Sequence, residues 1–143
     1  MKLAATVLAL SLAGTAQAEP RFVPANPGAP YSAAVQMGDV LYVSGQLAGR
    51  PDGSYPEGMA AQAKQAMDNV AAILKGQNLG LNDVFKCTAF LADMSQSADF
   101  NRVYVSSFDP KRLPARSALG ASGLPGGSLV EVECWAYAGG RRN

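Results

Sequence analysis

Histidine is absent from this chain of 143 residues. This absence removes the side chain that most often acts as a general base at neutral pH and most often ligates transition metals. A catalytic triad built on histidine is therefore excluded. The two cysteines, Cys87 and Cys134, do not have the spacing of a zinc cluster. We expect a site without a metal ion.

Internal repeats, low-complexity tracts, a hydrophobic run long enough to span a bilayer and an excess of charge of one sign are also missing. Lysine and arginine number 12, aspartate and glutamate number 11, and the formal net charge is +1. A nearly neutral chain with no basic cluster is a poor candidate for binding nucleic acid or a membrane surface. A chain of this length is expected to form one domain.

The first 18 residues have the pattern of a secretory signal peptide. Lys2 provides a positive start, residues 3–12 are apolar, and Ala16-Gln17-Ala18 is a small-residue cleavage site. The apolar run is too short to span a bilayer, and no stop-transfer pattern follows it. We expect cleavage after about Ala18, a single domain over residues 19–143, and a periplasmic or secreted protein.

Hydrophobic periodicity predicts an α+β fold. The predicted elements are strands at 31–36 and 40–44, a helix at 57–74, a strand at 84–91, a helix at 98–108, and strands at 115–121 and 128–138. Residues 21–23 are a further short strand candidate. The order β-β-α-β-α-β-β indicates a mixed sheet with two helices packed on one face.

The last predicted strand has two different faces. Strand alternation places Val130, Val132 and Cys134 on one face and Glu131 and Glu133 on the other. The apolar face is expected to meet the helices. The other face is too mixed for a second helix layer and too apolar for water, so we expect a homo-oligomer.

Both cysteines fall on the predicted apolar layer. Export would permit a disulfide between Cys87 and Cys134. Free cysteine also packs well in protein cores. We favour two buried thiols, with the disulfide as the alternative.

One arginine lies in unusually apolar company, in Leu113-Pro114-Ala115-Arg116-Ser117-Ala118. A guanidinium in such surroundings needs an anionic partner, because an unpaired buried charge is costly. The partner is either Glu131 or Glu133, which would make Arg116 structural, or the carboxylate of a ligand. The planar fork of arginine binds a carboxylate through two parallel hydrogen bonds.

Several short motifs, taken in order, resemble the RidA/YjgF family of enamine/imine deaminases from Tyr31 to Ala138. They are Ala29-Pro30-Tyr31-Ser32, Val43-Ser44-Gly45-Gln46, the helix at 61–69, Phe100-Asn101, Pro114-Ala115-Arg116-Ser117, Leu124-Pro125 and Val130-Glu131-Val132-Glu133. The resemblance implies a chorismate-mutase-like fold and a homotrimer with sites between subunits. It also implies hydrolysis of reactive 2-enamino and 2-imino acids to 2-keto acids and ammonia, without a cofactor or metal.

The resemblance also implies the roles of particular residues. Arg116 matches the arginine that holds the substrate carboxylate, and Glu131 matches a glutamate near the hydrolytic water. Glu131 either assists that water or pairs structurally with Arg116 or a neighbouring subunit. Ala118 stands where the archetypal deaminase has a cysteine, so a role for that thiol is absent here.

Four more residues match positions that line the family's cleft. They are Tyr31, Ser44, Gly45 and Asn101. Each has a structural alternative: Tyr31 packing at a subunit edge, Ser44 and Gly45 forming an ordinary strand end, and Asn101 fixing a loop backbone.

Two other function classes stay open. The protein is alternatively a trimeric binder of small carboxylates without turnover, or a chaperone-like interaction protein. A ribonuclease role is disfavoured, because without Lys2 the chain has 11 basic side chains beside 11 acidic ones.

Overall fold

The computed structural model describes residues 19–140, and the predicted signal peptide lies outside them. The elements are β1 (Arg21–Pro24), β2 (Ser32–Met37), β3 (Val40–Leu47), α1 (Met59–Gly76), β4 (Val84–Leu91), α2 (Ser97–Ser106), β5 (Ala115–Gly120) and β6 (Val130–Tyr137). Short 3-10 turns, η1 (Leu81–Asp83), η2 (Met94–Gln96) and η3 (Pro125–Gly127), lie in the connections. The predicted α+β fold is confirmed. The short candidate at 21–23 is a true strand, β1, so the order opens with three strands rather than two.

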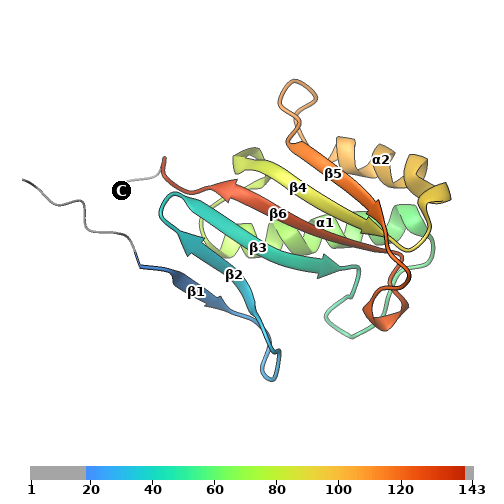
Figure 1. The fold of residues 1–143 in the computed structure, drawn as a ribbon, viewed down its shortest axis with the longest axis horizontal. Coiled ribbons are helices and arrows are strands. Elements are labelled where there is room, and N and C mark those ends of the chain that lie inside the picture. Colours follow the sequence, from blue (N-terminus) through green and yellow to red (C-terminus); the bar gives the residue numbers. More distant parts are fainter. Residues whose placement is uncertain (1–18, 141–143) are drawn as a thin grey trace, which may run out of the picture.

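The strands form one mixed sheet in the order β1-β2-β3-β6-β4-β5. Strands β4 and β5 are parallel, and all other neighbours are antiparallel. Strand β6, the last in the chain, therefore lies between β3 and β4. Both helices lie on one side of the sheet, as predicted (Figure 1).

The core fills the space between the sheet and the two helices. Helix α1 contributes apolar side chains at the three- and four-residue steps that place them on one helix face. These buried residues are Met59, Ala63, Ala66, Met67, Val70 and Leu74. On β6 the predicted alternation is confirmed, because Val130 and Val132 are buried while Glu131 and Glu133 are half-buried on the opposite face.

Cys87 and Cys134 form a disulfide within this core. The favoured prediction of two free thiols is therefore wrong, although both sulfurs do face the apolar layer as expected. The reason is the register of β4 on β6, which sets the two residues directly opposite each other. Side chains directly opposite on antiparallel strands are neighbours. Local alternation assigns a face to each cysteine but does not decide which residues face each other.

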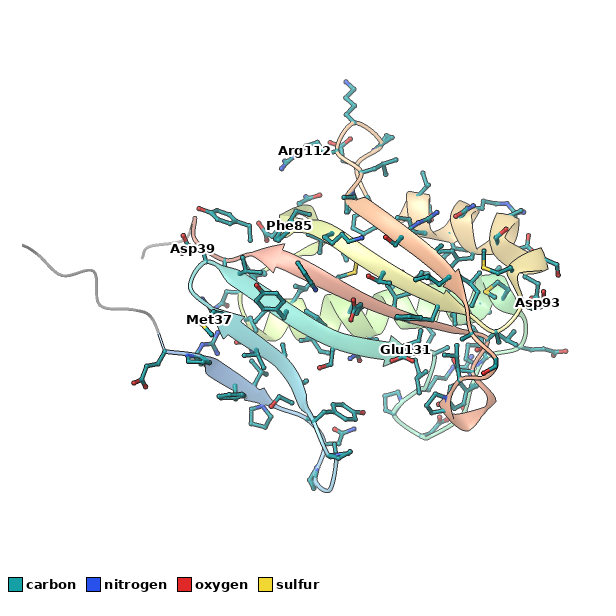
Figure 2. The ribbon with its side chains drawn as sticks, viewed as in Figure 1. Met37, Asp39, Phe85, Asp93, Arg112 and Glu131 are labelled. Atoms are coloured by element: carbon teal, nitrogen blue, oxygen red, sulfur yellow. A yellow bond between two sulfur atoms is a disulfide. The ribbon has the colours of Figure 1, made fainter. Side chains whose placement is uncertain are left out.

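The sheet face without helices carries a row of exposed apolar side chains. Cross-strand pairing runs from Phe22 to Val35, from Val35 to Tyr42, and from Tyr42 to Trp135. The rings of Tyr42 and Trp135 lie 5.0 Å apart, and Phe85 lies 6.4 Å from Trp135. Phe85 is labelled in Figure 2. We call the four exposed rings of this face, Phe22, Tyr42, Phe85 and Trp135, the aromatic row. A contiguous exposed apolar patch of this kind is typical of an interaction surface.

Candidate active site

A groove of about 990 Å³ lies where β3 and β6 meet the loop after β3. Its lining includes four of the six predicted site residues: Tyr31, Ser44, Gly45 and Glu131. We call these four the groove residues. In Figure 2 the two helices lie behind the sheet, and Glu131 is labelled at β6. The other two predicted residues, Arg116 and Asn101, do not line the groove.

A bulge in β3 shapes the groove wall. The register between β3 and β6 shifts between Val43 and Gln46. The Ser44 hydroxyl donates to the carbonyl oxygen of Ser32 at 2.6 Å, which ties the bulge to the start of β2. The Gln46 side-chain amide donates to the carbonyl oxygens of Ser44 at 2.8 Å and Gly45 at 3.1 Å. The bulge is therefore held by side chains in a fixed conformation, as its unpaired backbone groups require.

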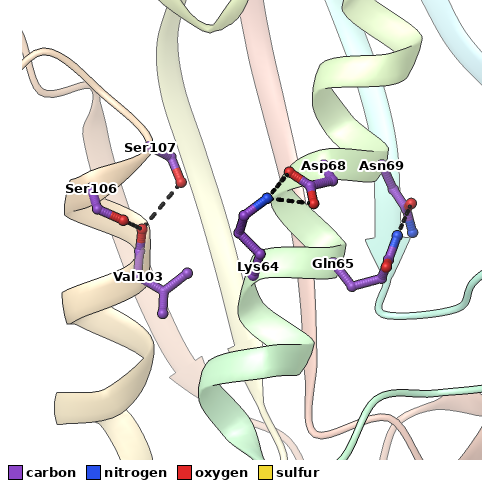
Figure 3. A network of polar contacts seen from close by, with 7 residues as sticks. All are labelled: Lys64, Gln65, Asp68, Asn69, Val103, Ser106 and Ser107. Atoms are coloured by element: carbon purple, nitrogen blue, oxygen red, sulfur yellow. Dashed lines mark hydrogen bonds and ion pairs between the residues drawn. The ribbon is translucent and has the colours of Figure 1, made fainter.

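Helix α1 holds the loop on the other side of the groove. The Asn69 side-chain amide donates to the carbonyl oxygens of Leu47 and Gly49, both at 2.9 Å. Gln65 in turn donates to Asn69 Oδ1 at 2.9 Å (Figure 3). This role of Asn69 was not predicted, although the residue belongs to the helical motif at 61–69. Gln65 and Asn69 are four residues apart, and this spacing in the sequence indicates that their side chains are neighbours on one helix face.

Gly45 lies directly against the carboxyl group of Glu131. A Cβ added at Gly45 would overlap Oε1 of Glu131 and would lie 2.8 Å from its Cδ. A side chain at this position would have to displace the carboxylate. The absence of a side chain at Gly45 therefore leaves the space in which the Glu131 carboxylate lies.

The environment of Glu131 changes its acidity. Burial raises the pKa of Glu131 above its ordinary value of 4.5, and the negative charge of Glu133 raises it further. Both effects disfavour the charged form. A carboxylate with a raised pKa is a stronger proton acceptor, which suits a general base at neutral pH.

Arg116 lies on the opposite face of the sheet from Glu131. It pairs with Cys87 across the parallel β4–β5 ladder, so its side chain shares the helix-facing side with that buried cysteine. Its Cζ lies 4.6 Å from the ring centroid of Tyr104 and 5.3 Å from that of Phe100. We call these three residues the arginine cluster.

No carboxylate of the described chain pairs with Arg116. The ion pairs within residues 19–140 are Lys64–Asp68 and Arg102–Asp99. The structural pairing of Arg116 with Glu131 or Glu133 is therefore not formed within one copy of the chain. Within residues 19–140 the guanidinium of Arg116 thus has no anionic partner.

Asn101 lies on α2, next to Phe100, and is half-buried. Its side chain makes no hydrogen bond to another residue of the part that the structure describes. Tyr104, one turn further along, was not predicted as a site residue. Its hydroxyl is buried without a hydrogen-bond partner in the described chain. The predicted site thus falls into two halves, one in the groove and one beside α2.

Residues 19–140 have neither a metal-binding cluster nor a membrane-spanning helix. No three histidine, cysteine, aspartate or glutamate side chains gather where they would hold a metal ion. Within the same residues no helix has the length and apolar character that crossing a bilayer requires.

The chain is therefore a small α+β protein, with a mixed sheet, two helices on one face, and candidate site residues on both faces. The family described as Endoribonuclease L-PSP matches residues 23–138. The chain belongs to this family, which is the RidA/YjgF family.

Relatives and solved structures agree with this assignment. The chain is 41% identical over 112 residues to the mouse protein named 2-iminobutanoate/2-iminopropanoate deaminase, covering 77% of this chain and 82% of the relative. It resembles the crystal structure of RidA from the Antarctic bacterium Psychrobacter with 40% identity and a TM-score of 0.73, covering 80% and 93% of the two chains. The Escherichia coli protein TdcF, whose structure holds bound serine, is 32% identical with a TM-score of 0.71, over 76% and 88% of the two chains.

Proposed function

We propose that the protein is an enamine/imine deaminase that hydrolyses 2-imino acids such as 2-iminobutanoate and 2-iminopropanoate. Water adds its oxygen to the imine carbon and protons pass to the nitrogen. The resulting carbinolamine then loses ammonia as the carbonyl of the 2-keto acid forms. The observation that carries the proposal is the unpaired guanidinium of Arg116, in a chain whose relatives at about 40% identity bear the deaminase name.

Each half of the site has a distinct task in this proposal. Arg116 binds the substrate carboxylate through its planar fork and so positions the imine carbon. Glu131, with its raised pKa, accepts a proton from the attacking water. Tyr31, Ser44 and Asn101 line the bound substrate. These roles require neither a metal nor a cofactor.

We further propose that the active protein is a homotrimer with its sites between subunits. Arg116 and Glu131 extend from opposite faces of one sheet, so one copy does not bring both to a single substrate. A neighbouring copy that supplies Arg116 to the groove residues would complete the site. The exposed aromatic row, with Trp135 and Tyr42 each 37% exposed, is the surface proposed to be covered by that copy.

Mixing two inactive variants tests the proposed function and assembly together. Arg116→Ala and Glu131→Gln are each expected to lose most of the hydrolysis of 2-iminobutanoate freshly generated by an amino-acid oxidase. When the two are unfolded together and refolded at equal ratio, sites between subunits would restore about a quarter of wild-type activity. No recovery would contradict a shared site. No rate difference between wild type and Arg116→Ala would contradict the deaminase proposal.

A second candidate function is binding of small carboxylates without turnover. It is favoured by one observation, the serine bound in the structure of the relative TdcF. Wild-type protein that binds 2-oxobutanoate but does not accelerate imine hydrolysis would support this candidate over the deaminase.

We also propose that the protein is exported and acts in an oxidising compartment. The Cys87–Cys134 disulfide supports this, since such bonds persist mainly outside the reducing cytosol. Mass spectrometry of protein from the periplasmic fraction of a bacterial host is expected to find a chain that begins near Glu19 with both thiols oxidised. Full-length chain retained in the cytosol would contradict export.

A further inference from the structure

The arginine cluster has a feature that its predicted role does not explain. The guanidinium of Arg116 makes no hydrogen bond or ion pair to the described residues, yet it lies against two buried rings. Phe100 is fully buried and Tyr104 is 2% exposed. An arginine side chain has several rotatable bonds, and ordering it costs up to about 2 kcal/mol of conformational entropy. Something other than polar partners therefore has to position it.

The rings form a rigid platform on one helix face. Phe100 and Tyr104 are four residues apart, and their ring centroids lie 5.7 Å apart. Phe108 continues the same row at 4.9 Å from Tyr104, but the guanidinium of Arg116 lies over the rings of Phe100 and Tyr104. Side chains four residues apart lie above one another on a helix. The platform is thus built into α2 and its immediate C-terminal extension.

Contact with ring faces leaves the donors of the guanidinium free. A cation within about 6 Å of an aromatic centroid is attracted by the electron density of the ring face. That attraction uses none of the five N–H donors of the guanidinium in a hydrogen bond. Arg116 is consequently ordered while its capacity to bind a planar carboxylate remains intact.

The phenol of Tyr104 stays neutral beside this charge. Burial raises the pKa of Tyr104 to about 12, although the nearby charge of Arg116 acts in the opposite direction. A phenolate at this position would pair with the guanidinium and neutralise it. The neutral ring instead stabilises the cation and leaves its charge available to an anionic ligand.

We infer that Tyr104 is a positioning residue that, with Phe100, holds Arg116 ready for the substrate carboxylate through the faces of the two rings. The inference rests on the proposed function only in naming a 2-imino acid as the ligand. It concerns any small carboxylate that Arg116 binds. In this inference the ring of Tyr104, and not its hydroxyl, positions the guanidinium of Arg116.

The test compares three variants in two measurements. One measurement is kcat and KM for 2-iminobutanoate, and the other is the Kd for 2-oxobutanoate, a stable keto acid. Tyr104→Leu removes the ring, and we expect KM and Kd to rise about tenfold while kcat changes by less than about threefold. Tyr104→Phe restores the ring without the hydroxyl and is expected to rescue both values. Phe108→Leu is the matched control, because it removes a buried ring of the same row that is not one of the two rings beneath the guanidinium.

Each contrary outcome has a definite meaning. KM and Kd of Tyr104→Leu within about twofold of wild type would overturn the inference, as would an equal rise in Phe108→Leu. A large loss of kcat in Tyr104→Phe would also overturn it, since the hydroxyl would then be the working group. If Tyr104→Leu does not fold, Phe100→Leu replaces it with the same expected direction. Wild-type protein without hydrolase activity would refute the proposed function alone, because the Kd series still tests the platform.

Discussion

The disulfide between Cys87 and Cys134 allows the sharpest prediction about stability. The perturbation is its reduction, which leaves both thiols in place in the core. The two residues are 47 positions apart, and both are fully buried. Closing a loop of this length removes chain entropy from the unfolded state that amounts to about 4 kcal/mol at 25 °C. Reduction is expected to lower the free energy of unfolding by about this amount.

Urea denaturation measures the effect directly. Oxidised protein is compared with protein that has been unfolded, reduced and refolded in the presence of a reductant. The protein concentration is held fixed, because any assembly makes the midpoint depend on concentration. For a domain of this size the expected loss moves the midpoint by roughly 2 M urea. A Cys87→Ala/Cys134→Ala double variant is the control, and its midpoint should not respond to reductant.

The reasoning would be refuted by midpoints that agree within about 0.5 M urea. Such a result would mean that β4 and β6 are already held together in the unfolded ensemble, so that the cross-link removes little entropy. Free thiols in protein purified from an oxidising compartment would refute the pairing itself.

Three further outcomes are expected. Gly45→Ala should lower kcat at least about tenfold by displacing the Glu131 carboxylate, yet change the free energy of unfolding by less than about 1 kcal/mol. Gly76→Ala is the control, because the space around its Cβ is open. An unchanged kcat in Gly45→Ala would contradict the role of this contact in placing Glu131. Because burial and then the charge of Glu133 raise the pKa of Glu131, kcat/KM should fall with decreasing pH around a value above 4.5. Glu133→Gln removes the second cause and should move this acidic limb to lower pH; a pH–rate profile with an unmoved limb would argue against Glu131 as the base. Trp135→Glu should dissociate the proposed trimer in sedimentation velocity while circular dichroism keeps the wild-type spectrum. A variant that sediments like the wild-type assembly would exclude the aromatic row from the interface.

Much of the fold follows from local pattern. The helical steps of residues 59–74 and the alternation of residues 130–136 each assign a buried face within one element. The turn at Met37-Gly38-Asp39 joins two strands whose pairing is local. These signals depend only on the periods of helix and strand, so they can be read without knowing what packs against what. The candidate residues came from matched motifs, and the structure places Tyr31, Ser44, Gly45 and Glu131 around one groove.

Tertiary structure decided the rest, because long-range strand order and register are not encoded in any single segment. The insertion of β6 between β3 and β4 aligned the two cysteines and brought Glu131 against Gly45. The parallel register of β5 on β4 put Arg116 on the helix side, over the rings of α2. A shift of one residue would reverse that face. The sequence by itself predicted an anionic partner for Arg116, because its neighbours along the chain are apolar. Only the packed sheet decided that Glu131 of the same copy does not supply it.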